Sequence, residues 1–142
     1  GRVGGQSLDV LLTDKPVNEK EMEFIFNLKT GALIEAAFMA GAILAGAGKE
    51  CVSQLEKAGN LVGVAFQIKD DILDVTSTQE VLGKPVFSDE KNNKTTYVKL
   101  YGMEKAVADV ENMSEKAESI VKSIGDNEFL IELINKLISR EK

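Results

Sequence analysis

Three acidic residues near the middle of the chain have the types and spacing of a metal site. Gln67 begins the run, and Asp70, Asp71 and Asp74 follow it. In an α-helix of about 3.6 residues per turn, these four side chains fall within one arc. Carboxylates held so close repel one another and lose hydration, so they stay ionised only beside a cation. Because the chain contains no histidine, oxygen ligands favour a hard ion such as Mg²⁺ or Ca²⁺.

The rest of this predicted helix is apolar over most of its circumference, which is typical of a helix inside a protein. The apolar positions opposite the acidic arc and along one flank are Leu61, Val62, Val64, Ala65, Phe66, Ile68, Ile72, Leu73 and Val75. Most acidic clusters on helices are solvated faces, and the three aspartates alone leave that alternative open. The apolar flank gives the carboxylates little route to bulk water, so it favours an inward-facing metal site.

The composition predicts a single all-α domain to carry this site. Of 142 residues, 44% are hydrophobic and 28% are charged, which is ordinary for a folded globular protein. The chain has two prolines, many helix-forming residues and no persistent alternation of apolar and polar positions. Its net charge of −6, with no run rich in lysine or arginine, argues against nucleic acid or an anionic membrane as the main partner.

One cysteine and one apolar run bear on the compartment. Cys51 is the only cysteine, so an intrachain disulfide is excluded and nothing indicates an oxidising environment; we expect a cytoplasmic protein. The least polar run, Gly31–Gly48, is shorter than the ~20 apolar residues that span a bilayer and includes Glu35. It is therefore interpreted as a core helix, and no stable membrane insertion is expected.

Turn and capping residues divide the chain into helices. Asn18 and Glu21 resemble a capping box that opens one helix, and Gly46 ends the next, whose small residues predict close packing. Apolar residues expected to fill the core in these two helices are Met22, Ile25, Phe26, Leu28, Leu33, Phe38, Met39, Ile43 and Leu44. The central helix is expected from about residue 50 to 75, where Thr76-Ser77-Thr78 would stop it.

Beyond the central helix we expect a loop and then two scaffold helices. A capping box at Ser77–Glu80 would open one short turn, and a polar loop would occupy residues 82–97. Gly102 breaks the following segment. Apolar residues at helical spacing then predict a helix over 106–124 and a final one over 129–138.

A negatively charged protein that binds an anionic substrate needs a metal ion and a few well-positioned lysines. Lys29 and Thr30 put one cation and one hydroxyl at a single level of a buried helix. Lys84 and Lys94 belong to the polar loop, from which they could reach the acidic site. Taken singly, each lysine is more commonly a surface residue.

Five short motifs follow one another over essentially the whole chain. They are Gly5-Gln6-x-x-Asp9, Lys29-Thr30-Gly31, Phe66-Gln67-x-x-Asp70-Asp71-x-x-Asp74, Leu82-Gly83-Lys84 and Lys94-Thr95-Thr96-Tyr97. Their order and spacing resemble the trans-isoprenyl diphosphate synthases, most of all the bacterial short-chain type that makes farnesyl diphosphate. The resemblance implies an all-α isoprenoid-synthase helical bundle. That family carries two aspartate-rich motifs and only the second is matched, so residues 1–142 are expected to be the C-terminal part of one such domain. We expect no turnover by this chain alone.

The activity that the resemblance implies is a Mg²⁺-dependent prenyl transfer. Isopentenyl diphosphate condenses head to tail with dimethylallyl or geranyl diphosphate, giving farnesyl diphosphate and diphosphate; Mn²⁺ is a possible substitute for Mg²⁺. The implied metal ligands are Asp70, Asp71 and Asp74, the implied diphosphate-binding residues are Lys29, Lys84, Lys94, Gln6 and Asp9, and the implied catalytic residues are Lys29, Thr30, Gln67 and Asp70. The family also implies a homodimer.

Four other functions share features with this one. The chain could be a geranylgeranyl diphosphate synthase, because the residues that set product length lie outside it in the family pattern. It could also be a non-catalytic helical partner of a prenyl synthase, although the acidic and lysine motifs are intact. A di-iron carboxylate bundle is excluded by the lack of histidine. Cyclising terpene synthases share the fold class, but their second metal motif usually combines Asn or Asp with Ser or Thr and Glu, rather than the three aspartates found here.

Overall fold

The computed structural model describes residues 16–26, 30–82 and 95–140, and the side chains of all of these except residues 23, 26 and 78–82. Its helices are α2 (Glu19–Phe26), α3 (Ala32–Leu44), α4 (Lys49–Leu82), α5 (Tyr97–Tyr101), α6 (Met103–Ile124) and α7 (Glu128–Ser139). The described ranges contain no strand, so the all-α prediction is confirmed.

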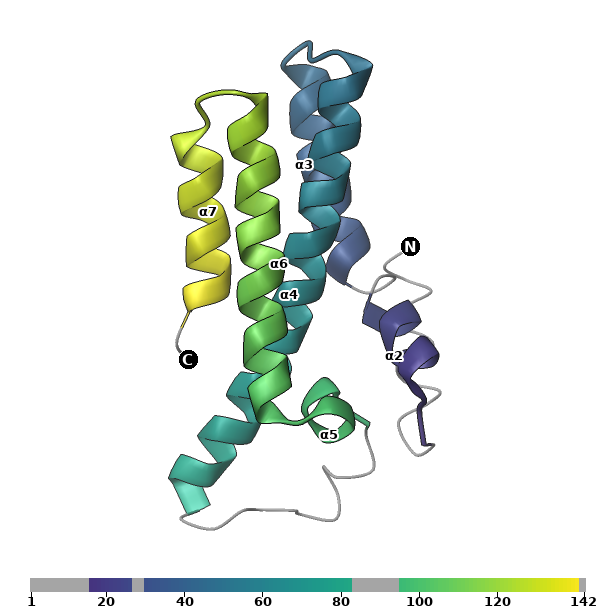
Figure 1. Ribbon diagram of the computed structural model, residues 1–142, viewed down its shortest axis with the longest axis vertical. Helices are drawn as coiled ribbons and strands as arrows, with labels where there is room; N and C mark the ends of the chain where they lie inside the picture. The colour runs from purple at the N-terminus through teal and green to yellow at the C-terminus, as the bar shows by residue number, and fades with distance from the viewer. Residues whose placement is uncertain (1–15, 27–29, 83–94, 141–142) are drawn as a thin grey trace.

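Helix α4 is the centre of the arrangement. Figure 1 shows α7, α6, α4 and α3 side by side, and α4 packs mainly against α6 and α3. The short helices α2 and α5 lie beside the later part of α4. The acidic run therefore lies on a helix that contacts each of the other described helices, so side chains from several helices can approach it.

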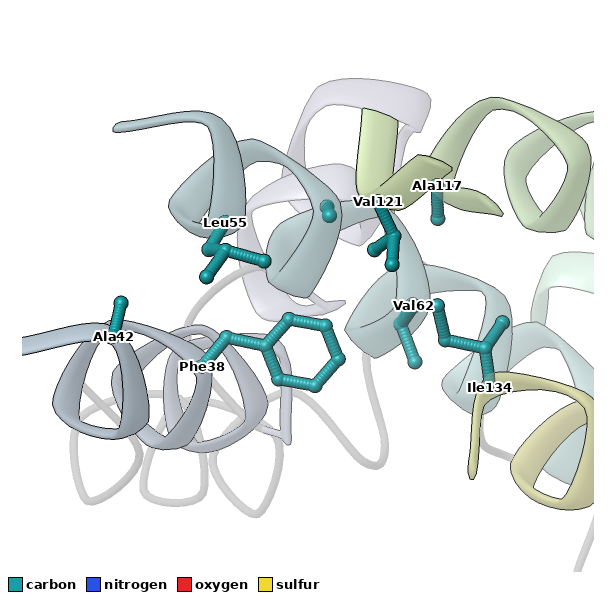
Figure 2. Close-up of a cluster of buried hydrophobic side chains, with 8 residues drawn as sticks. Phe38, Ala42, Leu55, Val62, Ala117, Val121 and Ile134 are labelled. Atoms are coloured by element: carbon teal, nitrogen blue, oxygen red, sulfur yellow. The ribbon is translucent and has the colours of Figure 1, made fainter. Parts of the chain in front are cut away.

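Two apolar clusters hold α4 in place. The first joins α3, α4, α6 and α7 (Figure 2) and consists of Phe38, Ala42, Leu55, Ala58, Val62, Ala117, Val121 and Ile134. The second lies around the later part of α4 and consists of Val17, Met22, Ile25, Ile68, Ile72, Ala106 and Val110. Because Ile68 and Ile72 alternate with the acidic residues along the helix, burial of their side chains fixes how the acidic arc is turned.

Helices α3 and α4 approach closely through glycines. A Cβ atom on Gly63 would lie 2.3 Å from the Cα of Gly31, and one on Gly59 would lie 2.8 Å from the Cα of Glu35. Asn60 adds a hydrogen bond from its side-chain amide to Glu35, at 3.1 Å. Only glycine fits such a backbone contact. The close approach is therefore made by Gly59 and Gly63 of α4. The prediction that it is made by the small residues in and directly after α3 is wrong, because these are mostly exposed: Ala36, Ala37, Ala40, Gly41, Ala45 and Gly46.

The predictions of a capping box at Asn18 and Glu21 and of breaks at Gly46 and Gly102 are confirmed. The Asn18 amide donates to the Glu21 carboxylate and the Glu21 amide donates to the Asn18 side chain, both at 3.0 Å, as in a capping box. Gly46 and Gly102 have φ values of 75° and 85°, which favour glycine. They end α3 and separate α5 from α6, respectively.

Two further predictions about the helices are wrong. Helix α4 does not stop at Thr76, because the hydroxyls of Thr76 and Ser77 donate to carbonyl oxygens one turn back and the helix continues to Leu82; the short capped turn at 77–80 is part of it. Leu33, Ile43 and Leu44, which were expected in the core, are 49%, 60% and 89% exposed. Helix α3 uses its opposite face, through Phe38 and Ala42, to contact α4.

No described helix combines the length and apolarity needed to cross a bilayer. Cys51 is half-buried and carries a free thiol. Cys51 packs against the first apolar cluster, as expected of a small packing residue. The interpretation of Gly31–Gly48 as a core helix is only partly right, because Gly31, Phe38 and Ala42 are buried whereas the other residues of the run are half-buried or exposed.

Candidate active site

The acidic run occupies the later part of α4, over the second apolar cluster. Gln67 is buried, with 6% of its surface exposed, and among the described residues it is the one buried polar side chain. Asp70 and Asp71 are half-buried and Asp74 is exposed. The apolar residues Ile68 and Ile72 on the other face are buried, as predicted. The run is thus neither fully inward nor a plain solvated face.

Asp70 forms an ion pair with Arg140, the residue that follows α7. One guanidinium nitrogen of Arg140, Nη2, donates to Asp70 Oδ1 and also to the Phe66 carbonyl oxygen at 3.3 Å. The guanidinium lies over the Phe66 ring, with 3.7 Å between its Cζ and the ring centroid. The sequence analysis did not identify Arg140, because it lies 70 residues from Asp70 and belongs to none of the five motifs.

Asp71 faces a different helix. Its carboxylate accepts a hydrogen bond of 2.8 Å from the backbone N–H of Tyr97, the first residue of α5. The Thr96 hydroxyl caps the same helix by accepting from the Lys99 amide, and the Thr95 hydroxyl accepts from the Val17 amide. The described part of the Lys94-Thr95-Thr96-Tyr97 motif is therefore anchored to the acidic run through Asp71.

A polar network continues from Tyr97 to α6. The Tyr97 hydroxyl donates to Asp109 at 2.6 Å, and Lys105 donates to the same carboxylate at 2.7 Å. Burial, with the hydrogen bond to Asp109, raises the pKa of Tyr97 well above its ordinary value. Burial alone would raise the pKa of Asp109, but the hydrogen bonds from Lys105 and Tyr97 lower it below its ordinary value. At neutral pH the Tyr97 hydroxyl therefore keeps its proton and Asp109 stays ionised, and the hydrogen bond between them joins α5 to α6.

Thr30 lies two residues before the N-terminal end of α3. It begins a single π-type turn, Thr30–Gly31, and it is half-buried. Gly31 contacts the backbone at Gly63, which is one helical turn before Gln67. The structure therefore brings the hydroxyl of Thr30 and the amide of Gln67 to neighbouring turns of two packed helices.

The remaining predicted site residues lie outside the described ranges. These are Gln6, Asp9, Lys29, Lys84 and Lys94. Within the described ranges, no three acidic, cysteine or histidine side chains form a group that could hold a metal ion. The three aspartates share one stretch of α4, but two of them are turned toward different helices.

The donor set nevertheless fits one kind of metal site. Mg²⁺ is usually held by one or two carboxylates together with substrate phosphates, rather than by a complete cage of protein ligands. The Asp70 carboxylate already lies against a cation, the Arg140 guanidinium. The acidic run therefore fits a magnesium site that substrate and other residues complete, and the assignment of the three ligands remains a prediction.

Comparison with known proteins agrees with the fold and with the family resemblance. The sequence pattern of the polyprenyl synthetase family matches residues 2–134. A geranylgeranyl diphosphate synthase of Cyanophora paradoxa is 41% identical over 119 residues, covering 83% of this chain and 40% of the relative. A farnesyl diphosphate synthase of Bacillus subtilis is 34% identical over 142 residues, covering 99% of this chain and 48% of the relative. The chain thus spans less than half the length of these relatives.

Among solved structures, the geranyltransferase of Helicobacter pylori, complexed with magnesium and isoprenyl diphosphate, superposes with a TM-score of 0.74 and 27% identity. The match covers 98% of this chain and 46% of the other. The same helices are therefore present in an enzyme of this fold. Since the family pattern matches nearly the whole chain, the chain belongs to the polyprenyl synthetase family.

Proposed function

We propose that this chain is the C-terminal part of a Mg²⁺-dependent trans-prenyltransferase. The enzyme would condense isopentenyl diphosphate with dimethylallyl or geranyl diphosphate, giving farnesyl diphosphate and diphosphate. The observation that carries the proposal is the acidic run of α4, with Asp70 against a cation and Asp71 holding the described part of a lysine-containing motif. Membership of the polyprenyl synthetase family supports it.

The metal would be held by Asp70, with Asp71 and Asp74 as further ligands or as hydrogen-bond partners of its water. When bound, Mg²⁺ neutralises charge on the diphosphate, which is otherwise a poor leaving group. The Helicobacter pylori geranyltransferase, of the same fold, is complexed with magnesium and isoprenyl diphosphate, and this supports the metal assignment. Mn²⁺, which takes similar oxygen ligands, is expected to substitute for it.

The chain's own residues would act on the diphosphate and on the carbocation. Lys29, Lys84 and Lys94 would bind diphosphate oxygens, and the C1–O bond of the allylic substrate would break with its electron pair left on oxygen. Thr30 and Gln67 would present a hydroxyl and an amide oxygen to the positive charge on the allylic carbon. The double bond of isopentenyl diphosphate would then attack C1, and loss of a proton from its C2 would complete the product.

The product and the catalytic unit are part of the same proposal. Farnesyl diphosphate is favoured by the similarity to the Bacillus subtilis farnesyl diphosphate synthase over 99% of this chain. Similarity to a geranylgeranyl diphosphate synthase favours a C20 product as the second candidate. Because the chain spans less than half of each relative, activity is proposed for the polypeptide or homodimer that also supplies the first acidic motif.

The decisive experiment uses the full-length protein with labelled isopentenyl and geranyl diphosphates. Product is expected only with Mg²⁺ or Mn²⁺, should disappear with a chelator, and should be identified by chain length as C15 or C20. The Asp70→Asn variant should lose the activity while it keeps its helical circular dichroism. Metal-independent product, or no product from a folded protein, would contradict the proposal. If a folded protein gives no product, the alternative that the protein is a non-catalytic partner of a second synthase subunit is favoured, and adding that subunit should restore turnover.

A further inference from the structure

Arg140 makes three contacts with a single turn of α4. Its guanidinium donates to the Asp70 carboxylate and to the Phe66 carbonyl oxygen, and it stacks on the Phe66 ring. Phe66 and Asp70 are four residues apart, so they lie one above the other on the same face of the helix. The Arg140 guanidinium therefore spans one turn of α4: it lies over the Phe66 ring and pairs with the Asp70 carboxylate one turn further along.

The position of Arg140 is set by the packing of α7. Ile134, in the middle of α7, is fully buried in the apolar cluster that also contains residues of α4 and α6. Helix α7 ends at Ser139, so the next residue leaves the helix directly beside the acidic run. The packed helix α7 thus fixes where the positive charge of Arg140 lies, and the contact with the Phe66 ring further restricts the orientation of its guanidinium.

This ion pair contributes little to folding. The side chains of Arg140 and Asp70 are 30% and 46% exposed, and ion pairs of this exposure usually add little to the stability of a protein. Arg140 Nε is buried without a hydrogen-bond partner among the described residues, which adds a cost. The contact is better explained by what it does to the Asp70 carboxylate than by a gain in stability.

We propose that Arg140 is a resident counter-ion that holds the Asp70 carboxylate until a complex of metal and diphosphate takes its place. The inference rests on the proposed function, because it takes Asp70 to be a metal ligand. A divalent ion that approaches Asp70 alone meets a fixed positive charge and must displace it. Diphosphate offers the departing guanidinium an equivalent set of oxygens, since arginine pairs with phosphate as readily as with carboxylate.

Two consequences follow for binding. Metal without diphosphate binds weakly, and each of the two ligands strengthens the binding of the other. Removal of the guanidinium leaves the Asp70 carboxylate without its competing cation, so metal alone binds more tightly and the benefit of diphosphate becomes smaller. A residue that merely tied α7 to α4 would change the stability of the protein but not this coupling.

The test measures free Mn²⁺ by electron paramagnetic resonance in the full-length protein, with and without inorganic diphosphate. In Arg140→Gln, we expect Mn²⁺ alone to bind about two- to fivefold more tightly, which is the factor that corresponds to an ion pair of this exposure. The gain in Mn²⁺ affinity on adding diphosphate should shrink by a similar factor. Arg140→Lys, which keeps the charge but loses the ring stacking and the forked geometry, should give an intermediate value and guards against a folding defect in the glutamine variant.

Two control variants separate this effect from general charge. Lys136→Gln removes one positive charge from the same helix, but Lys136 is exposed and pairs with Glu132, so Mn²⁺ binding should not change. In an Asp70→Asn background, Arg140→Gln should have no further effect. Unchanged or weaker Mn²⁺ binding in Arg140→Gln, or an equal gain in Lys136→Gln, would overturn the counter-ion role while leaving a working synthase. If Asp70→Asn does not alter Mn²⁺ binding and the wild type makes no product, the proposed function fails, and the counter-ion role fails with it.

Discussion

Two neighbouring segments of α4 are held by different kinds of contact. In residues 55–63, which we call the packing segment, Gly59 and Gly63 lie against the backbone at the start of α3. The buried apolar side chains of this segment are those of Leu55, Ala58 and Val62. In residues 66–74, which we call the polar segment, Asp70 binds the guanidinium of Arg140, directly after α7, and Asp71 accepts from the first backbone amide of α5. At its two glycines, the packing segment has no room for a larger side chain. In the polar segment, the carboxylates of Asp70 and Asp71 make contacts that a ligand could replace.

The difference separates stability from chemistry along one helix. Contacts of the packing segment leave no room for another atom, so changes there should act on the free energy of unfolding. Contacts of the polar segment are half-exposed hydrogen bonds and ion pairs, whose net stabilisation is small. Changes there should act on ligand binding and turnover, while the fold remains.

The largest effect is expected at Asp70, on activity. In the full-length protein, Asp70→Ala should lower turnover by about 10²–10³-fold, the usual loss when one group that stabilises developing charge is removed. Its helical circular dichroism and unfolding midpoint should stay close to wild type. The matched control is Asp126→Ala, which removes an exposed aspartate in the turn between α6 and α7. If Asp70→Ala unfolds the protein, the polar segment is structural and the comparison fails.

The next effect is expected at Gly63, on stability. In Gly63→Ala the added Cβ would lie 2.3 Å from the Cα of Gly31, and the two helices would have to separate. We expect the free energy of unfolding, measured with urea, to fall by about 3 kcal/mol. Gly41→Ala is the control, because a Cβ there meets no atom within 4 Å, and alanine in a helix should raise stability by about 0.5–1 kcal/mol. Equal behaviour of the two variants would show that the crossing is loose.

The two segments also differ in how far the sequence predicts them. Local signals were sufficient for the capping box of Asn18 and Glu21, for the chain reversal at Gly46 and for the burial of Ile68 and Ile72, because each depends on residues within one or two turns. The continuation of α4 through Thr76 was missed because a threonine hydroxyl can bond within a helix as well as cap one.

Contacts between distant parts of the chain could not be predicted in this way. No local pattern indicates that Arg140 reaches Asp70, or that the glycines of α4 meet Gly31 and Glu35, since these contacts depend on how packed helices cross. The aspartates were identified by type and spacing, but spacing along one helix does not indicate which partner each carboxylate contacts. Their different partners emerge only in three dimensions, and they give the two residues different roles to test.

Asp71 provides the next test within the polar segment. Asp71→Ala leaves the Tyr97 amide without its partner and should lower the free energy of unfolding by about 1–2 kcal/mol, as loss of a helix cap does. Asp71→Asn keeps an oxygen acceptor and should restore most of this stability. It should also retain more activity than Asp70→Asn. If Asp71→Asn and Asp70→Asn are equally inactive, Asp71 acts chiefly through its charge, as a metal ligand.

The smallest effect is expected at Asp109, and it appears as a dependence on pH. The pKa of this carboxyl is lowered from its ordinary value of 3.8, by hydrogen bonds from Lys105 and Tyr97 that outweigh the effect of burial. A lowered pKa means that the unfolded chain binds the proton more tightly, so the stabilisation is present above pH 3.8 and is lost as the pH falls through the folded-state value. Tyr97→Phe removes one of the two donors and should lower stability by about 1 kcal/mol at neutral pH, with a shallower further loss in acid than the wild type shows. Urea unfolding at about pH 7 and about pH 3 measures both the loss at neutral pH and the further loss in acid.

This network joins α5 to α6 without touching the packing segment, so its loss should leave the effect of Gly63→Ala on stability unchanged. Non-additive effects of Tyr97→Phe and Gly63→Ala would mean that the two segments are coupled.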